Sequence, residues 1–126
     1  MAKEKYQIEY PLKTSDRVLF NRLSTAGGLN EWFADNVIVQ GKIFTFEWSG
    51  VEQQAEMINK KELRYARFHW LDDDDDKTYF EFKINMDELT SDLALIVTDF
   101  AEPDEIADAK ELWDSQISEL KHILGS

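Results

Sequence analysis

One apolar stripe near the end of the chain constrains the fold more than any other feature. Pro103 suits a first helical position, and Gly125 is placed to end the helix. A helix of this length runs about 30 Å and needs a long apolar surface to cover, which the rest of the chain must supply. The members of the stripe recur at spacings of 3, 4, 4, 3 and 4, the period of one helix face, and are Ile106, Ala109, Trp113, Ile117, Leu120 and Leu124.

Before this helix, most of the chain alternates polar and apolar residues with the period of a half-buried strand. Turns are expected at Gly41-Lys42, Ser49-Gly50 and Lys60-Lys61, and Pro11 is expected to stop the first strand. The last strand is apolar on both faces, which is typical of a central or covered strand. The pattern predicts strands at 6–10, 36–40, 44–48, 53–59, 63–70, 79–86 and 93–100.

Two short helices are predicted between the first and second strands. Thr14 or Ser15 can cap the first of them, Gly27-Gly28 is expected to break it, and 29–33 reads as a second helical turn. The order is then one strand, two short helices, six strands and a long helix. That order predicts an α+β fold in which a curved, seven-stranded antiparallel sheet surrounds the long C-terminal helix, with a gap between helix and sheet.

Composition narrows the classes of function. With 126 residues the chain forms one domain, 1–126. Its 26 acidic and 14 basic residues give a net charge of −12, which argues against nucleic acid and anionic membranes as partners, because both bind clustered Lys and Arg. The sequence contains no cysteine. We see no export signal and no apolar run long enough to insert in a membrane, so we expect a cytoplasmic protein.

Metal and cofactor motifs are not apparent. Only two histidines occur, His69 and His122, so a three-histidine zinc site is excluded. The five aspartates at 72–76 suggest calcium, but consecutive side chains point in opposing directions, and we interpret them as a solvated hairpin loop. We predict no catalytic residue, no metal and no cofactor.

The candidate site is the gap between the sheet and the long helix. Aromatic residues are abundant on the predicted inner faces, where they either fill the core or line a ligand cavity. Tryptophan and phenylalanine pack less easily than Leu and Val, and each indole N–H needs a partner. The cavity candidates are Trp32, Phe44, Phe46, Trp48, Phe68, Trp70, Phe80, Phe82, Trp113 and Ile117.

Arg67 is a possible polar anchor for such a ligand. If Ala66, Phe68 and Trp70 point inward, Arg67 and His69 face solvent. A slip of one residue or a bulge would reverse this and bring the guanidinium of Arg67 inside, where it could hold a carboxylate.

Several blocks of sequence resemble a known family. These are Leu29-Asn30-Glu31-Trp32-Phe33-Ala34-Asp35, Phe44-Thr45-Phe46-Glu47-Trp48-Ser49-Gly50, Arg67-Phe68-His69-Trp70, 92–100 and Lys110-Glu111-Leu112-Trp113. In order and spacing they resemble the single-domain branch of the START-like superfamily that is similar to activators of heat-shock-protein ATPases, with a helix-grip fold. The match covers 8–124. This chain departs from the family at Asp99 and Leu112, where relatives often have Gly.

The resemblance implies a cavity that holds a small apolar, aromatic or amphipathic molecule, without catalysis. A second hypothesis is a co-chaperone-like module that acts on a heat-shock ATPase. A third is a polyketide-cyclase-like enzyme, which would need an acid–base group inside the pocket, supplied by Arg67, Tyr65, Asp99 or His69.

Overall fold

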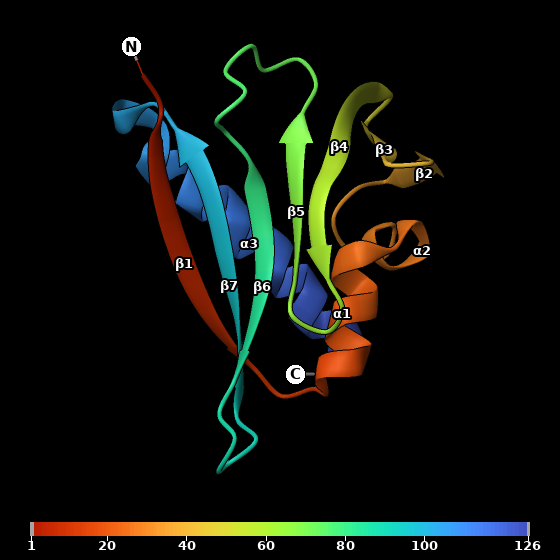
Figure 1. Cartoon of the computed structure of the whole chain (residues 1–126), viewed down its shortest axis with the longest axis vertical. Coiled ribbons are helices and arrows are strands. Elements are labelled where there is room, and N and C mark those ends of the chain that lie inside the picture. The colour runs from red at the N-terminus through yellow and green to blue at the C-terminus, as the bar shows by residue number, and fades with distance from the viewer. Residues whose placement is uncertain (1, 126) are drawn as a thin grey trace.

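Within residues 2–125, the computed structural model contains one antiparallel sheet of seven strands and three α-helices (Figure 1). The order across the sheet is β1-β7-β6-β5-β4-β3-β2. The first and last strands of the sequence are therefore neighbours, and the predicted α+β fold is confirmed. The strands are β1 Glu4–Leu12, β2 Asn36–Gln40, β3 Ile43–Trp48, β4 Val51–Lys61, β5 Tyr65–Trp70, β6 Phe80–Met86 and β7 Leu93–Ala101.

Two of the residues predicted to end a strand do not end it. Pro11 does not stop β1, which continues to Leu12 with Pro11 opposite Ala94. Proline is tolerated within β1 because β1 is an edge strand. The turn predicted at Lys60-Lys61 instead follows Lys61, and Leu63 there has a φ of 63°.

The first short helix begins where it was expected, and the second lies earlier than the predicted 29–33. Helix α1 (Asp16–Ser24) is capped by Ser15, one of the two predicted caps, whose hydroxyl accepts from the amide of Val18 at 3.1 Å. Helix α2 (Ala26–Leu29) contains Gly27 and Gly28, so the glycines do not break α1. A second cap, Thr25, ends α1 and begins α2, and its hydroxyl accepts from the amide of Gly28 at 2.9 Å.

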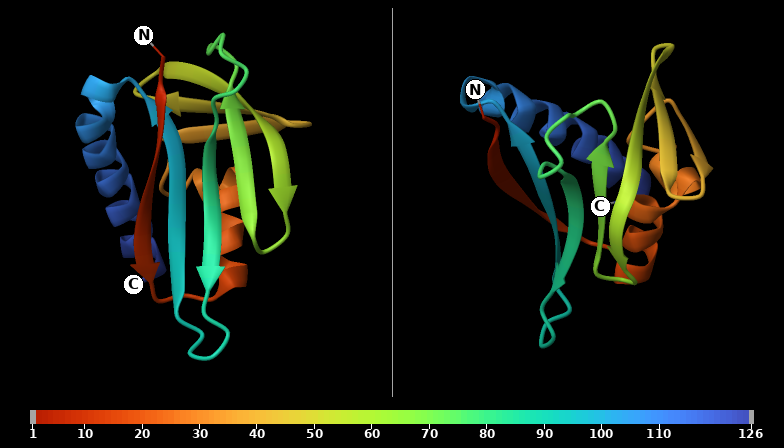
Figure 2. Two further views of the ribbon diagram at one scale, coloured as in Figure 1. Left: turned by 60° about the vertical axis from the view of Figure 1, so that its left-hand side comes forward. Right: turned by 45° about the horizontal axis from the view of Figure 1, so that its top comes forward.

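The long helix covers one side of the sheet. It begins with a 3₁₀ turn, η1 (Pro103–Glu105), and continues as α3 (Ile106–Leu124). Gly125 ends it in the left-handed conformation, with a φ of 70°. Helix α3 packs on β1 and β7, whereas α1 packs on β5 and β6. Figure 2 shows α3 running beside the curved sheet, with α1 toward its other edge.

The hydrophobic core fills the space between the concave face and the helices. Every second residue along a strand faces inward, and many of these side chains are fully buried, as period-two alternation requires. Helix α3 adds its stripe at Trp113, Ile117 and Leu120. The fully buried strand residues include Phe46, Phe68, Phe80, Phe82, Leu95 and Val97.

Candidate functional site

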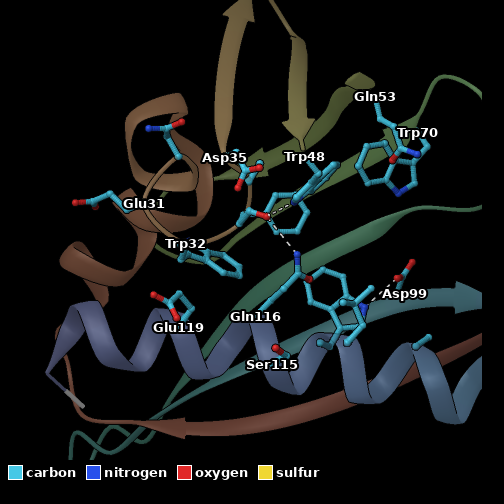
Figure 3. Close-up of a pocket in the computed structure, with 16 residues that line it drawn as sticks. Glu31, Trp32, Asp35, Trp48, Gln53, Trp70, Asp99, Ser115, Gln116 and Glu119 are labelled. Atoms are coloured by element: carbon cyan, nitrogen blue, oxygen red, sulfur yellow. Dashed lines mark hydrogen bonds between the residues drawn. The ribbon is translucent and has the colours of Figure 1, made fainter. Parts of the chain in front are cut away.

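A groove of about 860 Å³ lies between α3 and residues 30–35, the segment that follows α2 (Figure 3). Its far side is formed by the ends of β3, β4 and β5. The residues that line it are Asn30, Glu31, Trp32, Phe33, Ala34, Asp35, Trp48, Gln53, Trp70, Asp99, Ala109, Leu112, Trp113, Ser115, Gln116 and Glu119.

All four tryptophans of the chain line this groove. The indole N–H of Trp32 donates to the carbonyl of Arg22 at 2.8 Å. That of Trp48 donates to the carbonyl of Phe33 at 2.8 Å, and that of Trp113 to Asp99 Oδ2 at 3.0 Å. These bonds fix three rings, and a fixed aromatic wall loses little entropy when a ligand binds.

Phe33 closes the inner end of the groove. Its side chain is 4% exposed and enters the concave side of the sheet from the 30–35 segment. The ring lies 5.0 Å from Phe46 and 5.4 Å from Trp48 in edge-on contacts, and stacks 5.9 Å from Trp113, centroid to centroid. The carbonyl of Phe33 also accepts from Gln116 Nε2 of α3 at 3.2 Å. The segment is therefore attached to both the sheet and the helix.

The predicted cavity residues fall into two groups. Trp32, Trp48, Trp70 and Trp113 line the groove. The other six lie beneath it in the packed core, where Phe33 fills the concavity that they were expected to leave open. For example, the rings of Phe68 and Phe80 stack at 4.9 Å. The six core residues are Phe44, Phe46, Phe68, Phe80, Phe82 and Ile117.

Arg67 lies on the opposite, outer face of the sheet. Its Nε donates to Glu81 Oε2 at 2.8 Å, and its guanidinium lies 4.0 Å from the centroid of Tyr79. Ala66 and Phe68 are fully buried on the inner face. The inward alternative for Arg67 was therefore wrong: β5 keeps its alternation, and the only register shift of the β4–β5 pair among the described residues, between Met57 and Asn59, is in β4.

Asp99 was predicted only as a possible acid–base group of the enzyme hypothesis, and was not among the predicted ligand-binding residues. It accepts three hydrogen bonds, from the Phe100 amide at 2.8 Å, Trp113 Nε1 at 3.0 Å and the Tyr6 hydroxyl at 3.3 Å. Burial raises the pKa of Asp99, and the three donors lower it by less. Burial also raises the pKa of Tyr6, with the Asp99 charge adding to the effect. The inward position of Asp99 could have been predicted from the sequence. Asp99 lies an even number of residues from Val97 and Leu95, so its side chain points to the same inner face of β7.

The remaining polar side chains of the groove mostly hold its wall in place. Glu31 forms an ion pair with Arg22 of α1. Asp35 Oδ2 accepts from the amide of Ser49 at 2.8 Å, in the turn between β3 and β4. Together with Gln116, these contacts attach the 30–35 segment to α1, α3 and the sheet.

The raised pKa of Asp99 predicts how stability depends on pH. A carboxyl with a higher pKa in the folded state takes up its proton first there, so its contribution to stability increases as pH falls through that pKa and levels off below the ordinary value of 3.8. We expect the wild type to gain stability relative to Asp99→Asn between pH 7 and 4, measured by urea unfolding. A difference that is constant, or that decreases, would contradict this environment for Asp99.

Asp73 provides a control of opposite sign. Hydrogen bonds from Thr78 and Lys3 lower its pKa to about 2. A carboxyl with a lowered pKa stabilises the fold above the unfolded pKa and loses that contribution as pH falls toward its folded pKa. The wild type should therefore lose stability relative to Asp73→Asn below about pH 4.

Comparison with known proteins identifies the family. A family model described as a START-like superfamily domain matches residues 1–126. The chain belongs to this superfamily. A solution structure from Bacteroides fragilis is 46% identical, with a TM-score of 0.71 over 98% of this chain and 92% of that one. A comparison with curated proteins found no match.

More distant solved structures share the fold. A solution structure of the Aha1 dimer from Colwellia psychrerythraea is 17% identical, with a TM-score of 0.77 over 98% of this chain and 96% of that one. A crystal structure from Mesorhizobium loti is 15% identical, with a TM-score of 0.78 over 97% of each chain. The family model therefore confirms the resemblance to the START-like superfamily, and these structures confirm the helix-grip fold. Among the described residues, no helix is long and apolar enough to cross a membrane.

Proposed function

We propose that this START-like domain binds a small apolar or aromatic molecule, without catalysis, in the groove between α3 and the 30–35 segment. The observation that carries the proposal is the gathering of all four tryptophans around one opening of about 860 Å³. Pockets of roughly 300–1,000 Å³ suit small-molecule ligands. Burial of ligand and indole surface would provide about 25 cal/mol per Å².

The polar groups of the groove favour binding over chemistry. Asp99 already accepts three hydrogen bonds, Asp35 holds a turn and Gln116 holds the Phe33 carbonyl. These side chains position the walls, so a ligand would meet a preformed surface. Preformed sites bind more tightly because less ordering is needed.

The co-chaperone hypothesis has less support. Likeness to the Aha1 dimer concerns the fold, since identity to that protein is 17%. A heat-shock ATPase would have to bind an exposed surface such as the acidic outer face of α3. Stimulation of ATP hydrolysis by an added chaperone ATPase, unchanged when the groove is filled, would favour this second hypothesis.

We test the binding proposal with N-phenylnaphthylamine, a neutral dye whose emission rises in apolar surroundings. The dye should bind saturably, and Trp70→Ala should weaken binding about five- to thirtyfold, because a ligand-facing indole contributes on the order of 1–2 kcal/mol. Trp70 is half-buried, so its loss leaves the core in place.

Tyr79→Ala provides the matched control. This aromatic residue is also half-buried, but it lies on the outer face beside Arg67. Its replacement should leave dye affinity unchanged. No saturable binding, or equal losses in the two variants, would refute the proposal.

A further inference from the structure

Within residues 2–125, the charged side chains that line the groove are all acidic. Four carboxylates line it, those of Glu31, Asp35, Asp99 and Glu119. Among the described residues, no lysine or arginine lines it. An acidic groove of this kind disfavours the binding of an anionic ligand, because like charges repel strongly where water is partly excluded.

The carboxylates lie at both ends of the groove. Figure 3 shows Glu31, Glu119 and Trp32 on one side of the Gln116 amide, and Asp99, Gln53 and Trp70 on the other. Each end therefore combines an indole ring with a negative charge. Both attract a cation: the carboxylate by its charge, and the ring by the negative potential of its face.

The four carboxylates differ in how much charge they offer a ligand. The charge of Glu31 is neutralised by its ion pair with Arg22. Asp99 and Asp35 already accept hydrogen bonds from groups of the protein. Glu119 is exposed, and the structure gives it no hydrogen bond or ion pair within residues 2–125. It is the carboxylate best placed to meet an incoming cation.

We propose that the groove selects cationic amphiphiles, molecules with an aromatic or apolar body and a protonated amine or quaternary ammonium group. This inference rests on the proposed function, since it assigns a chemical class to the ligand of the same groove. The apolar body lies among the tryptophans, and the cation lies near Glu119 at one end or Asp99 at the other.

Three probes of similar shape test the charge preference. They are naphthylmethyl trimethylammonium, naphthylmethanol and naphthylacetate, which carry a positive charge, no charge and a negative charge on the same ring system. Isothermal titration calorimetry should rank their affinities in that order, with the cation at least about tenfold tighter than the anion. The same titrations in high salt show how much of the difference in affinity between the cation and the anion is removed when salt screens the charges.

A matched pair of variants separates the groove from the net charge of −12. Glu119→Gln removes a groove charge, whereas Glu111→Gln removes an exposed charge from the same helix outside the groove lining. Cation affinity should fall about fivefold in the first variant and remain unchanged in the second. Both positions are exposed, so both variants should fold.

The outcomes separate the two proposals. If naphthylmethanol and both charged probes fail to bind, the proposed function fails and the charge preference fails with it. If naphthylmethanol binds but the cation binds no tighter than the anion, only the charge preference is overturned. Equal losses in Glu119→Gln and Glu111→Gln would assign the preference to the whole molecule and would also overturn it.

Discussion

Replacing Phe33 by alanine should lower the free energy of unfolding by about 3–5 kcal/mol, the usual cost of removing a buried phenylalanine. The side chain is 4% exposed and fills the space between α3 and the concave face, where it stacks 5.8 Å from Phe80. No neighbour can fill that space without breaking the contacts of the sheet or of Trp113. Urea unfolding at constant pH measures the loss.

Phe100→Ala is the control for this substitution. Phe100 is half-buried on the outer face, and its ring centroid lies 5.1 Å from that of Tyr79. Its loss should cost about 1–2 kcal/mol, in proportion to the smaller area that it buries. Equal losses at Phe33 and Phe100 would show that Phe33 does not fill the interior.

Gly28→Ala should be nearly as damaging, for a different reason. A methyl group at this position would lie 2.7 Å from the Cα of Arg22 and closer still to the carbonyl oxygen of Asn21. Both are backbone atoms of α1, so α2 would have to move away from α1. Overpacking of this kind costs about 1–3 kcal/mol or more. Because α2 leads into residues 30–35, the groove wall should shift and dye affinity should fall as well.

Gly27→Ala is the matched control for Gly28→Ala. The two glycines are adjacent in α2, but a methyl group at Gly27 would meet nothing within 4 Å. In a helix, alanine is more stable than glycine by about 0.5–1 kcal/mol. Stability should therefore be unchanged or slightly higher. A loss in this variant as large as in Gly28→Ala would contradict the close approach of α2 to α1.

The fold could be predicted because alternation and helical period are local properties of the sequence. The 36–40 strand has the predicted bounds, and the 93–100 strand extends by one residue. Gly27 and Gly28 were misread because the reason for glycine at the second position is tertiary: α1 approaches it too closely for a side chain. The sequence of residues 26–29 alone gives no indication that α1 lies so close to Gly28.

The candidate site could be predicted only in part. The alternation of side chains along a strand shows which face of the sheet a residue is on, but not what packs against that face. Trp70 and Phe68 are both on the inner face of β5, yet Trp70 lines the groove and Phe68 is in the packed core. The difference depends on where Phe33 enters from a distant segment. Asp99, which was named only for the enzyme hypothesis, could have been placed at the site from the alternation of β7, because Leu95 and Val97 point to the same inner face.

The location of binding is tested most directly by nuclear magnetic resonance. N-phenylnaphthylamine is titrated into isotopically labelled protein, and the indole N–H signals of the four tryptophans are followed together with the backbone amides. The indole signals should shift saturably with one common dissociation constant, along with amides of residues 30–35. Amides of the 87–92 loop, which is outside the groove lining, should not move. Saturable shifts confined to other surfaces, with the four indole signals unchanged, would contradict a binding site between α3 and the 30–35 segment.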